Sequence, residues 1–225
     1  VGALAQVSDK AALAEGSLAR AYWLLTKNPS PNNDLLLAEV AHNLGVFLMN
    51  VGKVTESLPF LERSLELDRA ALKAQNNAMF RRTVHSGQLR LAAALRRHQK
   101  PESHSKALAI AKESLELAAD IDAAAVATSL LEIGALHFAR GDLLKAMEVT
   151  NSAINGLEEV STTMNTGIHA LQLGRAYVDM AIYARHLGRK AAATQSLNRA
   201  IEQANFAKSP ALTAMIGRES SIIQS

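Results

Sequence analysis

The chain has 225 residues, of which 48% are hydrophobic but only 4% aromatic, so its apolar side chains are mostly small or aliphatic. It contains no cysteine, which excludes disulfide bonds, thiolate metal sites and a cysteine nucleophile. Its formal net charge of +3 at pH 7 is small for this length and by itself implies no polyanionic partner.

The first predicted element is a helix over residues 8–27, where apolar side chains recur at helical spacing after Ser8, a candidate N-cap. Two prolines within residues 27–34 break this pattern, and Asp34 is a candidate N-cap for the next helix. We therefore expect a loop between the N-terminal helix and the following unit.

Residues 35–70 contain a complete helix–turn–helix unit. An apolar helix runs to Val51, Gly52 marks a polar turn, and a second helix occupies roughly residues 55–68. Pro59 lies in the first turn of this second helix, where its missing N–H removes no hydrogen bond.

Three further helix pairs and an end segment follow. The pairs are predicted at residues 71–120, 121–160 and 167–207. A polar break at residues 161–166 precedes the last pair, and residues 210–225 are expected to form a short helix over 211–217 and a polar tail. No segment shows the alternating pattern of a strand.

A basic block lies between Arg69 and Pro101, which enclose no acidic residue. Its later part reads as a basic amphipathic helix, although Ser86 and Gly87 are expected to kink or break it upstream. The patch comprises Arg81, Arg82, Arg90, Arg96, Arg97 and Lys100.

The patch either docks an acidic protein segment or is a solvated surface, and we favour the second interpretation. The solvated surface would pair with nearby glutamates, namely Glu62, Glu66, Glu113 and Glu116. Nucleic acid ranks last as a partner, because Phe80 is the only aromatic residue of the block and offers no stacking platform.

The helix pairs align on common columns of small residues, placed where the two helices of a pair would touch. One column holds Ser57, Ala107, Ala146 and Ala193; another holds Ser64, Ser114, Ala153 and Ala200; and Leu61, Ala111, Thr150 and Leu197 lie between them. The turn glycines Gly52, Gly141 and Gly188 also align, and seven residues before them stand Gly45, Gly134 and Ala181.

This pattern resembles the tetratricopeptide repeat family. The resemblance is carried by Asn43-Leu44-Gly45 with Leu48, Gly52 and Ser57, by Ile133-Gly134 with Gly141 and Ala146, and by Gly188 with Ala193 and Ala200. It is strong in the first, third and fourth pairs and degenerate in the second, which lacks a turn glycine. The long spacing is similar to the branch typified by kinesin light chains and spindle-orientation adaptors.

The resemblance implies an all-α fold, a right-handed superhelical solenoid of antiparallel helix pairs forming a single domain over residues 1–225. Elementary packing agrees, because a helix pair cannot bury its apolar face alone and stacking neighbours can bury it. The first helices of the pairs are then expected to line a concave groove that binds peptides or protein segments.

Carrying the family's groove positions over gives three sets of residues. The sets are Glu39, His42, Asn43, Val46, Met49 and Asn50; Thr128, Leu131, Glu132 and Ala135; and Arg175, Val178, Asp179, Ile182 and Arg185. Asn43 is the strongest candidate, because an amide can both donate to and accept from a ligand backbone. The alternative is that Asn43 satisfies a neighbouring backbone group. The two-lysine clamp for terminal carboxylates found in some family members is not reproduced.

No catalytic, metal or cofactor site is predicted. None of the seven histidines forms an i, i+4 ligand pair of the HExxH type. The glycines between Gly45 and Lys53 lack the spacing of a phosphate loop, and no GxSxG motif is present. We therefore expect a protein that is not an enzyme.

We expect a cytoplasmic interaction scaffold whose partner is a protein or peptide, acidic if the basic patch takes part. The alternative is a regulatory or sensor domain of a bacterial signalling or transcription protein, binding a signalling peptide or a small molecule. No apolar run approaches the roughly 18–20 residues of a membrane helix, and the N-terminus lacks the basic start of a signal peptide. Because residue 1 is Val1 rather than methionine, we expect a processed product or an excised domain.

The end segment raises a third hypothesis, self-association. Its apolar residues are Met215, Ile216, Ile222 and Ile223. They either cap the last repeat or bind a second copy of the chain, which would make a homo-oligomer.

Overall fold

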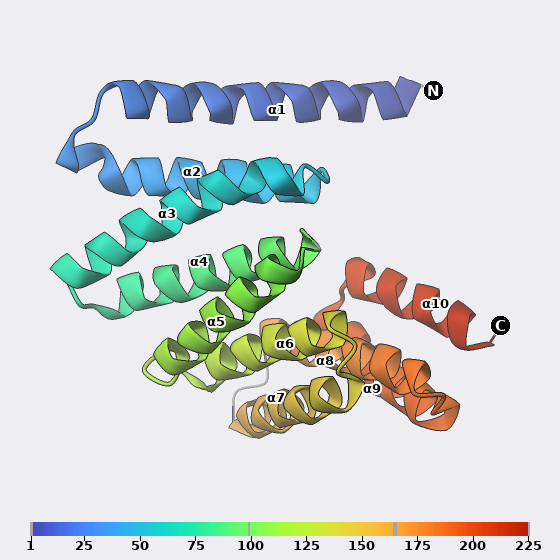
Figure 1. Ribbon diagram of the computed structural model, residues 1–225. Coiled ribbons are helices and arrows are strands. Elements are labelled where there is room, and N and C mark those ends of the chain that lie inside the picture. Colours follow the sequence, from blue (N-terminus) through green and yellow to red (C-terminus); the bar gives the residue numbers. More distant parts are fainter. Residues whose placement is uncertain (1, 99, 164–165, 225) are drawn as a thin grey trace. The chain divides into compact units, whose positions relative to one another are not determined.

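The computed structural model describes residues 2–98, 100–163 and 166–224, and these residues form helices but no strand (Figure 1). The helices are α1 (Gly2–Lys27), the 3-10 helix η1 (Pro31–Asn33), α2 (Asp34–Asn50), α3 (Val54–Ala74), α4 (Ala78–Arg97), α5 (Pro101–Ala118), α6 (Ala123–Ala139), α7 (Leu143–Thr163), α8 (Gly167–His186), α9 (Lys190–Ala207) and α10 (Pro210–Gln224). The all-α prediction is confirmed. Within these described ranges no helix combines the length and apolarity needed to cross a membrane.

The chain divides into two compact units, a first unit over residues 1–110 and a second unit over residues 111–225, with the division inside α5. In the first unit, α1 packs on α2, α2 on α3, and α3 on α4. In the second unit, α6 packs on α7, α7 on α8, and α8 on α9, while α10 covers parts of both α8 and α9. The single-domain organisation and the handedness of the solenoid stay predictions.

Three of the helix pairs turn on a glycine, as the sequence predicts. Gly52, Gly141 and Gly188 have φ angles of 86°, 80° and 71°, a left-handed conformation that glycine adopts without strain. In each turn the N–H of the next residue donates to a carbonyl five residues back, as from Lys53 to Leu48 at 2.9 Å. This closure satisfies helix-end carbonyls and reverses the chain within a few residues.

The pair α4–α5 has no turn glycine and uses two histidines instead. The Nδ1 atom of His98 lies 3.0 Å from the hydroxyl of Ser103, and His104 donates from Nε2 to the backbone carbonyl of Arg96 at 3.2 Å. These bonds tie the start of α5 to the end of α4. Both histidines therefore have structural partners, which explains their position around Pro101.

The columns of small residues are buried, as expected for positions where two helices touch. Ser57, Ala107, Ala146 and Ala193 are each 0% exposed. At Gly45 a Cβ atom would lie 2.7 Å from Leu61 Cγ and 3.2 Å from the Leu61 backbone nitrogen. The backbones of α2 and α3 thus approach so closely that only glycine fits without displacing Leu61.

Two expectations for helix starts are wrong. Ser8 does not cap the first helix, since α1 begins at Gly2 and the good helix formers among residues 2–7 extend it backwards. Asp34 is the first residue of α2 rather than its N-cap, which is Asn33.

The basic helix α4 is continuous through Ser86 and Gly87, where we expected a kink or break. Gly87 is buried, and a Cβ there would touch Leu65 of α3 at 3.4 Å. Packing against α3 offsets the roughly 1 kcal/mol that a glycine costs inside a helix.

The C-terminal half also differs from expectation. Helix α7 continues to Thr163, so the polar break is shorter than predicted, and residues 164–165 lie outside the described residues. Residues 218–224 are helical rather than a polar tail, because Leu212, Ile216 and Ile223 form one apolar face of α10 that is buried in the core of the second unit. The end segment therefore caps the last helix pair of its own chain.

Candidate functional site

The first unit contains a cavity of about 500 Å³ between α2 and α4, floored by α3, which we call the α2–α4 pocket. Its lining residues are Leu35, Ala38, Glu39, His42, Ser64, Asp68, Met79, Phe80, Arg82, Thr83 and Ser86. Two of these, Glu39 and His42, are predicted groove residues, and Arg82 belongs to the predicted basic patch. The structure thus brings together residues from two separate predictions.

The face of α2 continues beyond this pocket with exposed amides. The side chains of Asn43 and Asn50 are exposed, and within residues 2–98, 100–163 and 166–224 neither makes a hydrogen bond. The structure therefore does not support the alternative that Asn43 satisfies a neighbouring backbone group. Val46 is half-buried, whereas Met49 is only 4% exposed and lies in the interior, which corrects its assignment to the groove.

Two titratable groups of the pocket are shifted by their surroundings. The pKa of His42 is lowered, first by burial and then by the positive charge of Arg90. Its imidazole is therefore neutral at pH 7 and can both donate and accept a hydrogen bond. Burial raises the pKa of Asp68, although a hydrogen bond from the Ser64 hydroxyl, at 3.4 Å, acts in the opposite direction.

Only part of the predicted basic patch faces the same way as the pocket. Arg82, Arg90 and Arg97 are exposed and lie within about 80° of one another around α4, on the side that also carries Met79. Arg81 points elsewhere and donates to Asn76 at 3.0 Å. Arg96 is half-buried, and Lys100 is exposed just before α5.

Two of the glutamates that we expected beside this patch are engaged elsewhere. Glu62 pairs with Lys106, and Glu66 pairs with Arg63 at 2.7 Å. Neither cation belongs to the patch. This corrects the expectation that Glu62 and Glu66 neutralise it.

In the second unit two of the predicted groove residues, Thr128 and Arg185, are bonded to side chains of other helices. Gln172 of α8 donates to Thr128 of α6 at 3.1 Å, and Arg185 of α8 donates to Glu219 of α10. Val178 is 1% exposed and lies in the core, which corrects its assignment to the groove.

The other predicted positions of this unit differ in exposure. Glu132 and Asp179 are half-buried and each makes a polar or electrostatic contact, and Leu131, Ala135 and Ile182 are also half-buried. Arg175 is exposed and, in the described part of the chain, forms no ion pair or hydrogen bond through its side chain.

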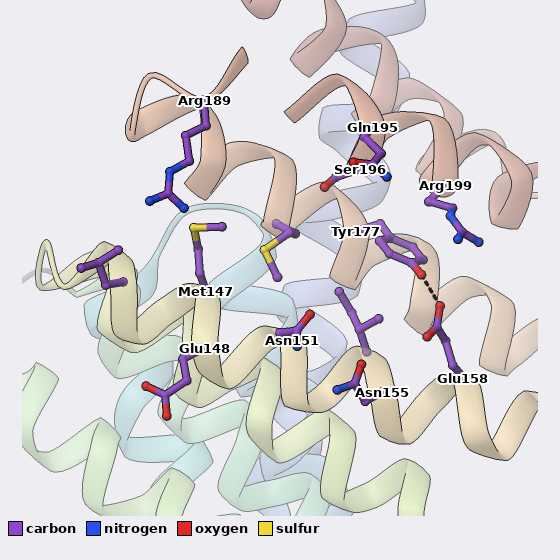
Figure 2. Close-up of a pocket in the computed structure, with 13 residues that line it drawn as sticks. Met147, Glu148, Asn151, Asn155, Glu158, Tyr177, Arg189, Gln195, Ser196 and Arg199 are labelled. Carbon is purple, nitrogen blue, oxygen red and sulfur yellow. Dashed lines mark hydrogen bonds between the residues drawn. The ribbon is translucent and has the colours of Figure 1, made fainter. Parts of the chain in front are cut away.

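A second cavity, of about 560 Å³, lies between α7 and α9 and is not anticipated by the sequence analysis (Figure 2). We call it the α7–α9 pocket; its lining residues are Leu144, Met147, Glu148, Asn151, Ile154, Asn155, Glu158, Tyr177, Met180, Arg189, Gln195, Ser196 and Arg199. Tyr177 and Met180 come from the side of α8 opposite Arg175 and Asp179. A sequence signal was present, because Asn151, Asn155 and Glu158 are spaced along one face of α7.

The Tyr177 hydroxyl donates a hydrogen bond to the Glu158 carboxylate, drawn in Figure 2. The pKa of Tyr177 is strongly raised, mainly by burial and then by this carboxylate. Tyr177 therefore stays protonated and holds Glu158 at one end of the pocket. In the described ranges no group of three or more histidine, aspartate or glutamate side chains is placed to hold a metal ion.

Comparison with known proteins gives a family match for one segment and a likeness of fold for most of the chain. Residues 38–70 match the family model described as tetratricopeptide repeat. None of the curated proteins matches the chain.

Three solved structures are similar. A Rap protein in complex with Competence and Sporulation Factor has a TM-score of 0.72 and 16% identity, over 96% of this chain and 55% of that one. The TPR-like repeats of a putative kinesin light chain from Podosopora anserina have a TM-score of 0.62 and 15% identity, over 88% and 89%. BtubC (BKLC) from P. vanneervenii has a TM-score of 0.50 and 14% identity, over 86% and 90%. This chain thus spans about half the length of the Rap protein, and the likenesses show a common helical-repeat fold.

Proposed function

Because residues 38–70 are a tetratricopeptide repeat and the chain has the helical-repeat fold of that family, we propose that it is a protein-interaction module. Its partner segment binds on the face of the first unit formed by α2 and α4. The observation that carries this proposal is the α2–α4 pocket, where Glu39, His42 and Arg82 converge.

The pocket offers an apolar mouth with a few polar groups. Leu35 and Met79 line it and are 52% and 62% exposed, so both have apolar surface that a ligand can cover. Burying such side chains against a ligand yields roughly 25 cal/mol per Å² of apolar surface. An apolar side chain of the partner therefore anchors there, and His42 and Glu39 provide hydrogen-bonding groups for the segment around it.

The charge of this face favours an acidic partner. The exposed side of α4 carries Arg82, Arg90 and Arg97, whereas the facing side of α2 carries one carboxylate, Glu39. The excess positive charge attracts a segment rich in aspartate or glutamate, and the exposed amides of Asn43 and Asn50 bind its backbone.

Peptides selected from a displayed dodecapeptide library on the intact chain test this proposal. A selected peptide is synthesised with a fluorescent label, and its affinity is measured by fluorescence polarisation. Arg90→Glu is expected to weaken binding at least tenfold at low salt, and affinity is expected to fall as ionic strength rises. Lys73→Glu, the same charge change at an exposed position of α3 outside the pocket, is the matched control. Unchanged affinity in both Arg90→Glu and Asn43→Ala would contradict the proposal.

A second candidate function is a sensor domain that binds a soluble signalling molecule. The likeness to the Rap protein supports it, since that protein was crystallised with Competence and Sporulation Factor and its similarity extends over 96% of this chain. A sensor transmits binding to distant helices, whereas a scaffold needs only local contacts. Hydrogen exchange in the presence of the selected peptide separates the two: protection confined to α2–α4 favours the scaffold, and changes that reach α8–α10 favour the sensor.

A further inference from the structure

We propose that the α7–α9 pocket is a second peptide site, which holds an extended segment of a partner protein on the face of the second unit opposite Arg175 and Asp179. Its ligand has an apolar side chain and at least one acidic side chain, and its backbone is bound by side-chain amides. This site is independent of the α2–α4 pocket and lies on the second helices of the pairs.

The walls of the pocket carry several exposed side-chain amides. Figure 2 shows Asn151 and Asn155 on α7, and Gln195 and Ser196 on α9, with Tyr177 and Glu158 toward one end of the pocket. Within the described ranges of the chain, the side chains of Asn151, Asn155 and Gln195 make no hydrogen bond. Each carboxamide offers donors and an acceptor, which are the groups that a peptide backbone needs.

The spacing of these amides fits an extended chain. Asn151 and Asn155 are one helical turn apart, about 6 Å at 1.5 Å per residue. An extended peptide repeats its outward backbone groups every two residues, about 6.7 Å. A helical ligand has already used its backbone groups internally and could not pair with these amides. The lining of α7 from Leu144 to Glu158 spans about 21 Å, which corresponds to roughly six extended residues.

The floor and the charges define the side chains of the ligand. Met147 and Met180 are half-buried in the floor, and methionine adapts its shape to apolar side chains of different size. Both carboxylates of the lining are already engaged, Glu158 by Tyr177 and Glu148 by Lys145 at 3.0 Å. The hydrogen bond from the neutral Tyr177 hydroxyl leaves Glu158 negatively charged, so the lining carries two carboxylates and two arginines.

Arg189 is the cation of the described lining that remains open to a ligand. The Arg189 side chain has no ion pair or hydrogen bond in the part of the chain that the structure describes. Arg199 reaches its nearest carboxylate, Glu202, only at 4.0 Å. The charge of Arg189 is complementary to an aspartate or glutamate side chain of the ligand.

Selection of a displayed octapeptide library on the intact chain tests the site, with counter-selection on the double variant Asn151→Ala/Asn155→Ala. Peptides that bind the natural chain but not the variant are synthesised with acetylated and amidated ends, which removes terminal charges. We expect sequences that combine an apolar with an acidic residue. Binding is expected to weaken about tenfold in the double variant and in Arg189→Glu.

Two control variants test whether the loss of binding is specific to the residues that line the pocket. Lys190→Glu makes the same charge change at the neighbouring exposed position, and Thr194→Ala removes a polar group of α9 that does not line the pocket. Both are expected to bind as the natural chain does. Circular dichroism checks that every variant retains its helices.

The ¹³C-methyl signals of methionine report where a peptide binds. Met147 and Met180 are expected to shift while Met79, in the α2–α4 pocket, stays in place. Shifts at Met79 alone would support the proposed function of the first unit and overturn this site. Failure to recover any peptide that depends on Asn151, Asn155 or Arg189 would also overturn it, without bearing on the first unit.

Discussion

The two units use the same helix-pair frame but leave opposite faces available. In the first unit, the first helices α2 and α4 carry exposed amides and arginines around a pocket. In the second unit, the corresponding face of α8 is tied to α6 and α10 by Gln172 and Arg185, and the pocket lies between the second helices α7 and α9. The repeat therefore determines how helices pack, whereas the neighbours of each helix determine which face remains free to bind.

The contact between α8 and α10 covers one face of α8 in the second unit, and Arg185→Ala is expected to weaken it. Glu219 is 6% exposed, so removal of its arginine leaves a buried carboxylate without a cation. We expect a loss of about 3 kcal/mol in the free energy of unfolding, measured by urea denaturation, with faster hydrogen exchange in α10. Arg199→Ala, at an exposed and long ion pair, is expected to change stability by less than about 0.5 kcal/mol.

If the double variant Arg185→Ala/Glu219→Ala recovers none of this loss, the two residues do not act as a pair. Another contact of α10 would then be what covers this face of α8.

The shared frame is tested by Gly45→Ala. The added Cβ must displace the buried Leu61, so we expect the free energy of unfolding to fall by about 1–3 kcal/mol despite the higher helix propensity of alanine. Gly134→Ala should act in the same direction in the second unit, since its Cβ would meet Thr150. At Gly16 a Cβ meets nothing within 4 Å, and Gly16→Ala is expected to stabilise the chain by about 0.5–1 kcal/mol. Equal effects at Gly45 and Gly16 would refute the close approach of α2 and α3.

The α7–α9 pocket is probed by Tyr177→Phe, which removes the hydrogen bond to Glu158. Denaturation at pH 7 is expected to show a loss of about 1 kcal/mol. Because the pKa of Tyr177 is raised in the folded state, the unfolded chain releases this proton first as the pH rises above about 10. The folded chain therefore loses stability in that alkaline range, and Tyr177→Phe should lose less of it; an identical pH profile would contradict the bond.

The α2–α4 pocket gives the smallest expected effect, in the acidic range. The pKa of His42 is lowered, so below about pH 6.5 the unfolded chain takes up this proton more readily than the folded chain does. Stability contributed by the neutral His42 is complete above that pH and is lost as the pH falls. His42→Gln should flatten the profile of unfolding free energy, and Arg90→Gln should flatten it partly. A steeper profile in Arg90→Gln would mean that Arg90 does not act on His42.

Local chemistry explains which features could be predicted from the sequence. Gly52, Gly141 and Gly188 lie where helices end, because few other residues tolerate a positive φ angle. A glycine at the end of an apolar helical pattern can be recognised from the sequence alone. The columns of small residues are equally visible, since close helix packing repeats at fixed offsets. The pocket residues Glu39 and His42 could be found through the family resemblance, because they keep their place relative to Gly45.

Other features could not be predicted from the sequence, because they depend on contacts between residues that are far apart in the chain. The polar composition of residues 218–224 suggests a tail, yet α8 and α9 provide a surface that orders Ile223. Met49 and Val178 occupy groove positions by alignment but turn into the core by their angle on the helix. The α7–α9 pocket is formed by side chains from three helices, α7, α8 and α9. Its Tyr177 lies on the side of α8 opposite the predicted groove residues Arg175 and Asp179.

The sequence by itself determined the helix pairs, their turns and the small residues at which they touch, because these depend on backbone geometry and on spacing along a single helix. Tertiary structure alone decided which polar side chains remain unpaired: among residues 2–98, 100–163 and 166–224, Asn43 and Asn155 find no partner, whereas Arg185 and Thr128 have one. The physical reason is that a hydrogen bond or an ion pair needs two groups in contact, and here those groups come from helices far apart in the chain.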